Sequence, residues 1–112
     1  MDSWNAQLRK GVVQILILQV LSEEPLYGYA LVKRLESLGD FVAGEGTVYP
    51  VLRRLEAGGL LGSVWEGDGP GNPRKYYSVT SEGRRFLASA IGEWNRIDGA
   101  IRDLGGAEHG MD

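Results

Sequence analysis

Two pairs of cationic side chains, Arg53-Arg54 and Arg74-Lys75, are the groups of this chain best suited to bind an anion. Arginine donates two parallel hydrogen bonds to a phosphate or to the O6 and N7 acceptors of guanine, and lysine binds phosphate as a point charge. Tyr49 lies just before the first pair and could stack or donate to phosphate. These side chains suit the phosphates and base edges of double-stranded DNA, provided that the fold brings both pairs to one face.

The first pair lies in a segment with helical periodicity, from about Thr47 to Ala57. At about 100° per residue, its apolar side chains fall on one face and would be buried. This apolar set is Val48, Val51, Leu52 and Leu55. The other side would present Tyr49, Pro50, Arg53 and Arg54 outward, and Pro50 is compatible with a first helical turn, where amides lack partners. We therefore predict a recognition helix whose N-terminal dipole also favours phosphate.

A β-hairpin is predicted directly after this helix. Leu60 to Glu66 and Lys75 to Val79 have strand composition, and the segment between them is rich in glycine and proline. An isolated Arg-Arg pair on a helix is most often a solvated face. The hairpin changes that interpretation, because it would place Arg74-Lys75 at its tip on the same side of the domain as Arg53-Arg54. The order of a helix followed by a two-stranded wing indicates a winged helix-turn-helix.

The remaining elements complete this arrangement. Residues 4–21 are apolar almost all round, which allows a buried helix or a strand, and the length favours the helix. A second helix is expected over Leu26 to Leu38, followed by a turn over 40–46, which makes the helix-turn-helix. The last helix would begin after a Thr80 or Ser81 cap and end near Leu104. The chain thus divides into a DNA-binding region, 1–80, a helix, 81–104, and a tail expected to be disordered, 105–112.

Composition sets limits on the function. The chain has 112 residues, no cysteine and a net charge of −3, which fits one soluble domain in a reducing cytoplasm. An acidic protein is not a typical nucleic-acid binder, but residues 46–85 carry six Arg or Lys side chains against four Asp or Glu. The apolar run from Val12 to Leu21 is half the roughly 20 residues that a transmembrane helix needs. We expect a cytoplasmic protein with a locally basic face.

Nothing in the sequence indicates catalysis or a cofactor. The single histidine, His109, lies in the expected tail, and the chain has no HExxH motif and no phosphate-binding loop of the Walker type. Glu23-Glu24 are adjacent on a turn, where a solvated pair is the usual outcome, and no spaced cluster of metal ligands occurs. The chain is therefore expected not to be an enzyme and to hold neither a metal ion nor a cofactor.

Three blocks of the sequence, 25–29, 46–56 and 73–83, resemble the signature segments of the PadR family of bacterial regulators. The resemblance covers about residues 8–104. It implies an α+β, mainly helical winged helix-turn-helix with a C-terminal dimerisation helix, as in the small PadR subfamily, and it makes the first segment a helix. It also implies a homodimeric transcription factor, usually a repressor, which in several members responds to small molecules. By this similarity the DNA-binding residues are Thr47, Tyr49, Pro50, Arg53, Arg54, Arg74 and Lys75.

The last helix carries an apolar stripe. Leu87, Trp94 and Ile101 recur every seven residues, with Ala90, Ile97 and Leu104 beside them. The stripe could be core of its own domain, but the resemblance implies packing against the first helix and a second copy. Trp94 would then fill the dimer core or form one wall of a slot for a planar aromatic effector. The residues expected at this dimer interface or ligand pocket are Trp4, Leu8, Leu87, Ile91, Trp94, Ile97 and Ile101.

Two copies would bind a pseudo-palindromic operator, with half-sites about one helical turn, roughly 34 Å, apart. Glu45 differs from the proline of many relatives and would repel phosphate if it faced DNA. This residue and the acidic balance favour one alternative from another class, a winged-helix protein–protein interaction module without DNA binding. A MarR-like regulator is a further alternative, disfavoured by the short chain.

Overall fold

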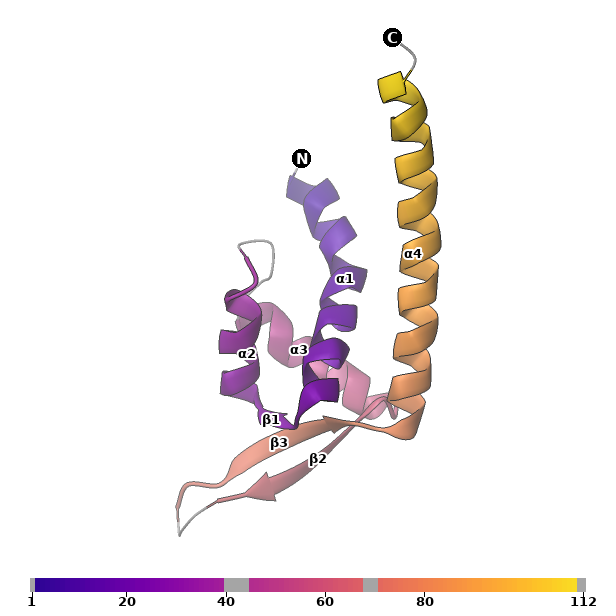
Figure 1. The fold of residues 1–112 in the computed structure, drawn as a ribbon. Coiled ribbons are helices and arrows are strands. Elements are labelled where there is room, and N and C mark those ends of the chain that lie inside the picture. The colour runs from indigo at the N-terminus through magenta and orange to yellow at the C-terminus, as the bar shows by residue number, and fades with distance from the viewer. Residues whose placement is uncertain (1, 40–44, 68–70, 111–112) are drawn as a thin grey trace.

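The computed structural model describes residues 2–39, 45–67 and 71–110 and confirms a mainly helical winged helix-turn-helix (Figure 1). The predicted turn over 40–46 and the tip of the hairpin fall largely outside these residues, as do the last two of the chain. Seven elements follow one another in the chain. They are α1 (Asp2–Glu23), β1 (Leu26–Tyr27), α2 (Gly28–Glu36), α3 (Glu45–Ala57), β2 (Leu61–Glu66), β3 (Arg74–Val79) and α4 (Ser81–Gly110).

Helix α1 is the centre of the molecule. Figure 1 shows it between α2 and α3 on one side and α4 on the other, which explains why its sequence is apolar almost all round. Ile17 and Leu18 of α1 are fully buried, and so are Leu31 and Leu35 of α2. The four apolar residues of α3 predicted to face inward, including Leu52 at 0% exposure, are all buried. The structure therefore confirms both the helix and the inner face that the helical period predicted.

Glycine ends α3 and directs the chain into the hairpin. Gly59 has a φ of +82°, a left-handed conformation that glycine adopts without steric cost. Its amide donates to the carbonyl of Glu56 at 3.0 Å, and the Leu60 amide donates to the carbonyl of Leu55 at 2.9 Å. These two bonds form a Schellman cap. As a result, α3 and β2 are joined by only three residues, and the wing is held close to the end of α3.

The sheet has three antiparallel strands in the order β1-β3-β2. Strands β2 and β3 form the predicted hairpin, in which Leu61 pairs with Val79 and Glu66 with Arg74. Strand β1 was not predicted, because its two residues were assigned to the start of the second helix. Leu26 pairs with Tyr77 and Tyr27 with Tyr76, so the partner lies about fifty residues away in the chain. No local pattern in Leu26-Tyr27 could indicate that pairing.

Helix α4 begins at the predicted cap, since the Gly83 amide donates to Oγ1 of Thr80 at 3.0 Å. It runs alongside α1 and continues beyond it (Figure 1). The predicted disordered tail is wrong over 105–110, because the helix continues without a break to Gly110. Among the residues that the structure describes, none of the helices is both long enough and apolar enough to span a bilayer.

Candidate nucleic-acid interface

The outward face of α3 is polar and accessible. Thr47, Pro50, Arg53 and Arg54 are exposed, while the residues between them face the core. Glu45 forms the first residue of α3 and is also exposed. Two guanidinium groups on the exposed side of a short helix, with a hydroxyl in its first turn, have the composition of a surface that reads DNA in the major groove.

Tyr49 does not lie on this outward face, so its predicted orientation is wrong. Its ring is half-buried and packs against the first turn of α2, where Gly28 leaves space for it. An ideal Cβ at Gly28 would lie 2.5 Å from Cε1 of Tyr49 and 2.9 Å from its hydroxyl oxygen. Burial raises the pKa of the Tyr49 phenol, and the charge of Glu45 raises it further. Tyr49 thus joins α2 to α3, a contact that depends on a glycine 21 positions earlier in the chain.

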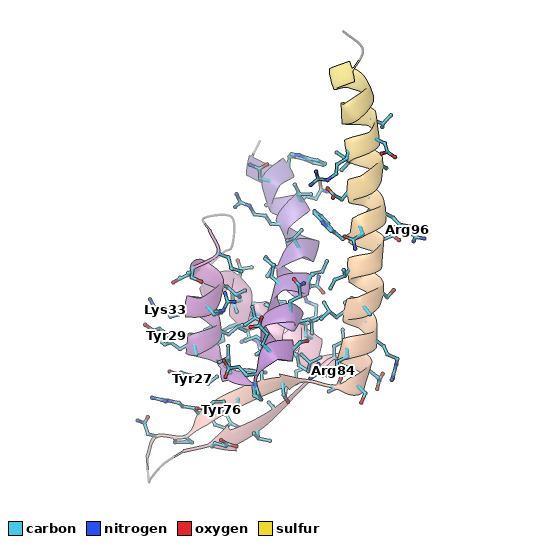
Figure 2. The ribbon with its side chains drawn as sticks, in the orientation of Figure 1. Tyr27, Tyr29, Lys33, Tyr76, Arg84 and Arg96 are labelled. Carbon is cyan, nitrogen blue, oxygen red and sulfur yellow. The ribbon has the colours of Figure 1, made fainter. Side chains whose placement is uncertain are left out.

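The basic pair of the wing is divided between the two faces of the sheet. Successive strand residues point to opposite sides, so Arg74 and Lys75 cannot act as one patch. The guanidinium of Arg74 lies over the ring of Tyr27, with Cζ 4.5 Å from the ring centroid. Tyr27 in turn meets Tyr76 edge to face, at a centroid distance of 5.5 Å (Figure 2). The two rings hold an exposed cation on the outer face of the wing.

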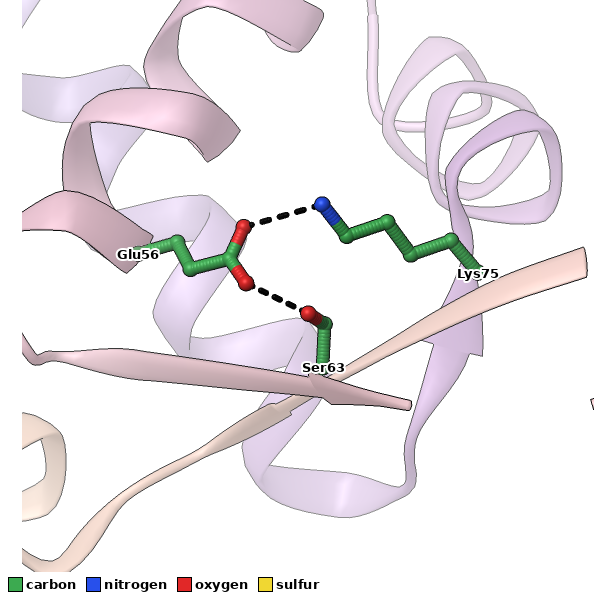
Figure 3. Close-up of polar contacts among 3 residues, drawn as sticks. All are labelled: Glu56, Ser63 and Lys75. Carbon is green, nitrogen blue, oxygen red and sulfur yellow. Dashed lines mark hydrogen bonds and ion pairs between the residues drawn. The ribbon is translucent and has the colours of Figure 1, made fainter. Parts of the chain in front are cut away.

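Lys75 points to the other face and is engaged within the protein. Its Nζ lies 3.1 Å from Oε1 of Glu56 at the end of α3, while the Ser63 hydroxyl donates to Oε2 of the same carboxylate (Figure 3). The Ser63 and Lys75 hydrogen bonds hold the pKa of Glu56 below its usual value, and Glu56 raises the pKa of Lys75. This cluster ties the recognition helix to both strands of the wing. The sequence predicted Lys75 as an exposed cation, whereas in the structure it forms an ion pair with Glu56.

The predicted dimer residues form one exposed apolar face on α1 and α4, with two exceptions. Trp4, Leu8, Trp94, Ile97 and Ile101 are exposed, and Trp94 retains 44% of its accessible surface. Leu87 is buried in the protomer's own core, so its assignment to the interface is wrong, and Ile91 packs against the same core. The reason is that α4 packs against both β3 and α1, so its side chains on that side join the protomer's core.

A groove of about 320 Å³ separates α1 from α4. It is lined largely by apolar side chains, among them Leu8, Phe86, Trp94 and Ile97. Its volume lies near the lower end of the range for small-molecule sites. Within the described residues no cluster of histidine, aspartate or glutamate could hold a metal ion, and the side chain of His109 falls outside them.

Both the sequence and the fold of the chain are similar to those of PadR-like transcriptional regulators. Residues 17–89 match the model of the transcriptional regulator PadR-like family. The crystal structure of a PadR family transcriptional regulator from Eggerthella lenta is 42% identical, with a TM-score of 0.79 over 92% of this chain and 89% of that one. The structure of a PadR-like transcription factor from Bacteroides fragilis is 32% identical in sequence, with a TM-score of 0.77 over 92% of this chain and 99% of that one. A transcriptional regulator of Mycobacterium tuberculosis is 31% identical over 104 residues, 92% of each chain.

Proposed function

Since this chain belongs to the PadR-like family of transcriptional regulators, we propose that it is a homodimeric repressor that binds a pseudo-palindromic operator and is released by a small molecule. The observation that carries the proposal is the outward face of α3, where Thr47, Pro50, Arg53 and Arg54 are exposed together. Arg53 and Arg54 would contact base edges or phosphates in the major groove, and Arg74 would contact the flanking backbone. A protein with this role acts on DNA in the cytoplasm.

The exposed apolar face on α1 and α4 supports dimerisation. A single protomer leaves Trp4, Leu8, Ile97 and Ile101 in solvent, and an apolar face of this kind favours association. A two-fold axis through α4 would bring two copies of the same face together, as isologous interfaces require. Two α3 helices would then reach successive major grooves, with half-sites roughly 34 Å apart.

The groove between α1 and α4 supports an effector site. Trp94 presents a partly exposed ring to this groove, and a dimer would contain two such rings. A planar aromatic molecule could stack on them with a gain of about 0.5–1.5 kcal/mol beyond burial. It would release DNA only by binding more tightly to a dimer whose α3 helices do not fit the groove spacing.

Enrichment of genomic fragments by the purified protein, followed by sequencing, tests the function. The expected result is a small set of fragments sharing a two-fold symmetric sequence, and the Arg53→Ala/Arg54→Ala variant should not enrich them. Fusion of an enriched promoter to a reporter gene then distinguishes repression from activation. If the wild-type protein enriches no sequence at low salt, DNA binding is wrong and the protein–protein interaction module is the better interpretation.

The effector site is tested separately, by quenching of indole fluorescence with planar aromatics and cationic dyes. A ligand that stacks on Trp94 should quench the wild-type protein more than the Trp94→Phe variant. Equal quenching of the two proteins would show that the ring serves only packing.

A further inference from the structure

We propose that Arg9 and Lys10 of α1, together with Arg54 of α3, seat a backbone phosphate of the bound DNA in the groove between these two helices. The inference rests on the proposed function and adds a contact that lies outside the helix-turn-helix and the wing. The ligand is the phosphodiester backbone, so the contact would add affinity without reading sequence.

The groove is built from both helices. It has a volume of about 400 Å³. Its described lining residues are Ala6, Arg9, Lys10, Val13, Gly46, Thr47, Pro50, Val51 and Arg54. Three of these are cationic, one carries a hydroxyl group, and none of those described is acidic. Because Thr47, Pro50 and Arg54 also belong to the exposed side of α3, DNA lying along that side would pass the mouth of the groove.

The cations of this groove stand apart from the ion pairs of the described residues. In the described part of the chain, none of the ion pairs includes Arg9, Lys10 or Arg54. Lys33, Lys75 and Arg102, by contrast, each have a carboxylate within 4 Å. Glu45 lies on the Tyr49 side of α3 at 100° per residue, away from the groove, and its charge raises the pKa of Tyr49. A protein with net charge −3 thus keeps a local positive field beside its recognition helix.

The dimer would leave this groove open. At 100° per residue, Arg9 and Lys10 lie on the face of α1 opposite to Leu8 and Ile15, which line the apolar groove against α4. A second copy that covers the apolar face would therefore not cover the two cations. Arg9 and Lys10 lie before residues 17–89, the segment that the family model matches.

The test is the salt dependence of DNA binding by the Arg9→Ala/Lys10→Ala variant. Loss of one phosphate contact lowers the slope of log K against log salt by about 0.9. For a dimer on two half-sites, the ratio of affinities at 50 and 200 mM salt should then fall by about tenfold. The loss should be equal for operator and scrambled DNA, because phosphates carry no sequence.

The matched control is Arg96→Ala/Arg102→Ala, which removes the same charge from α4. Both side chains are exposed and paired with carboxylates of their own helix, and Figure 2 shows Arg96 on the side of α4 that faces away from α1. This variant should keep the wild-type slope. The Arg9→Lys/Lys10→Arg variant should also keep it, because it retains both charges.

Three outcomes would overturn the proposal. One is a wild-type slope in Arg9→Ala/Lys10→Ala while Arg53→Ala/Arg54→Ala lowers it, which leaves the proposed function intact. A second is an equal loss in the charge-retaining variant, which would mean that packing matters and not charge. The third is a groove that binds inorganic phosphate, measured by calorimetry, while DNA affinity does not respond to either residue; the site would then serve a small anion. A wild-type protein that binds no DNA would remove the proposed function as well.

Discussion

Replacing Gly28 with alanine should destabilise the helix-turn-helix, because the ring of Tyr49 already occupies the space that a side chain would need. The new Cβ would lie 2.5 Å from Cε1 of Tyr49, well inside the optimal carbon separation of roughly 3.5–4.0 Å. If the ring stays, overpacking costs about 1–3 kcal/mol. If the ring swings into solvent, it loses its partial burial, about half of the roughly 1.5–3 kcal/mol for a fully buried large side chain.

The gain in helix propensity offsets part of this cost. Alanine is better than glycine by up to about 1 kcal/mol in a helix interior, and by less at the first helical residue, where Gly28 lies. The net loss in the free energy of unfolding is then about 0.5–1.5 kcal/mol, which lowers Tm by roughly 3–8 °C in a domain of this size. Thermal unfolding followed by circular dichroism measures the change, at one protein concentration because a dimer's Tm depends on it.

Gly92→Ala is the control for this experiment. Gly92 is exposed on α4 and an added Cβ there would meet nothing within 4 Å, so the substitution should raise stability by up to about 1 kcal/mol. A Tyr49→Ala background should remove the penalty of Gly28→Ala, which a double-mutant cycle detects as coupling. This role of Gly28 would be refuted if Gly28→Ala were as stable as the wild type, or if the penalty of Gly28→Ala were unchanged without the Tyr49 ring.

Three further predictions concern the wing and the dimer. Arg74→Ala should lower the slope of log K against log salt for DNA binding by about 0.9 per half-site, because Arg74 is exposed over the ring of Tyr27. Lys75→Ala should change this slope less, because Lys75 is paired with Glu56. Equal slopes for the two variants would contradict the different roles of Arg74 and Lys75. Because the pKa of Glu56 is lower in the folded state than the unfolded value of 4.5, the ionised carboxylate stabilises the fold above pH 4.5, and this stabilisation is lost as pH falls through the folded pKa. Urea unfolding should therefore show a smaller loss in the free energy of unfolding below pH 4.5 for Glu56→Gln than for the wild type. Parallel curves of this free energy against pH would refute the prediction. Ile101→Glu should raise the dimer dissociation constant at least about a hundredfold, because Ile101 is exposed in the protomer and the dimer would bury a carboxylate from each copy there. Sedimentation equilibrium measures the dissociation constant. An unchanged constant would exclude Ile101 from the interface.

The amino-acid sequence was sufficient to predict those elements whose pattern lies within one short segment of the chain. The inner face of α3 follows from a 3.6-residue period, and Val48, Val51, Leu52 and Leu55 lie where that period predicts. The hairpin follows from strand composition around a glycine-rich turn, and Thr80 caps α4 as predicted. The order of these elements was sufficient to predict a winged helix-turn-helix.

The tertiary structure decided which side chains of the interface are available. Whether a residue of β3 faces outward depends on the register against β1 and β2, so adjacent Arg74 and Lys75 acquire different partners. Tyr49 turns inward because of a glycine on another helix, and Leu87 is buried because α4 packs against both β3 and α1. Arg9 and Lys10 lie beside Arg54 although more than forty positions separate them in the chain. Each of these contacts joins segments far apart in sequence, and the local periodicity of one segment carries no information about the surface of another.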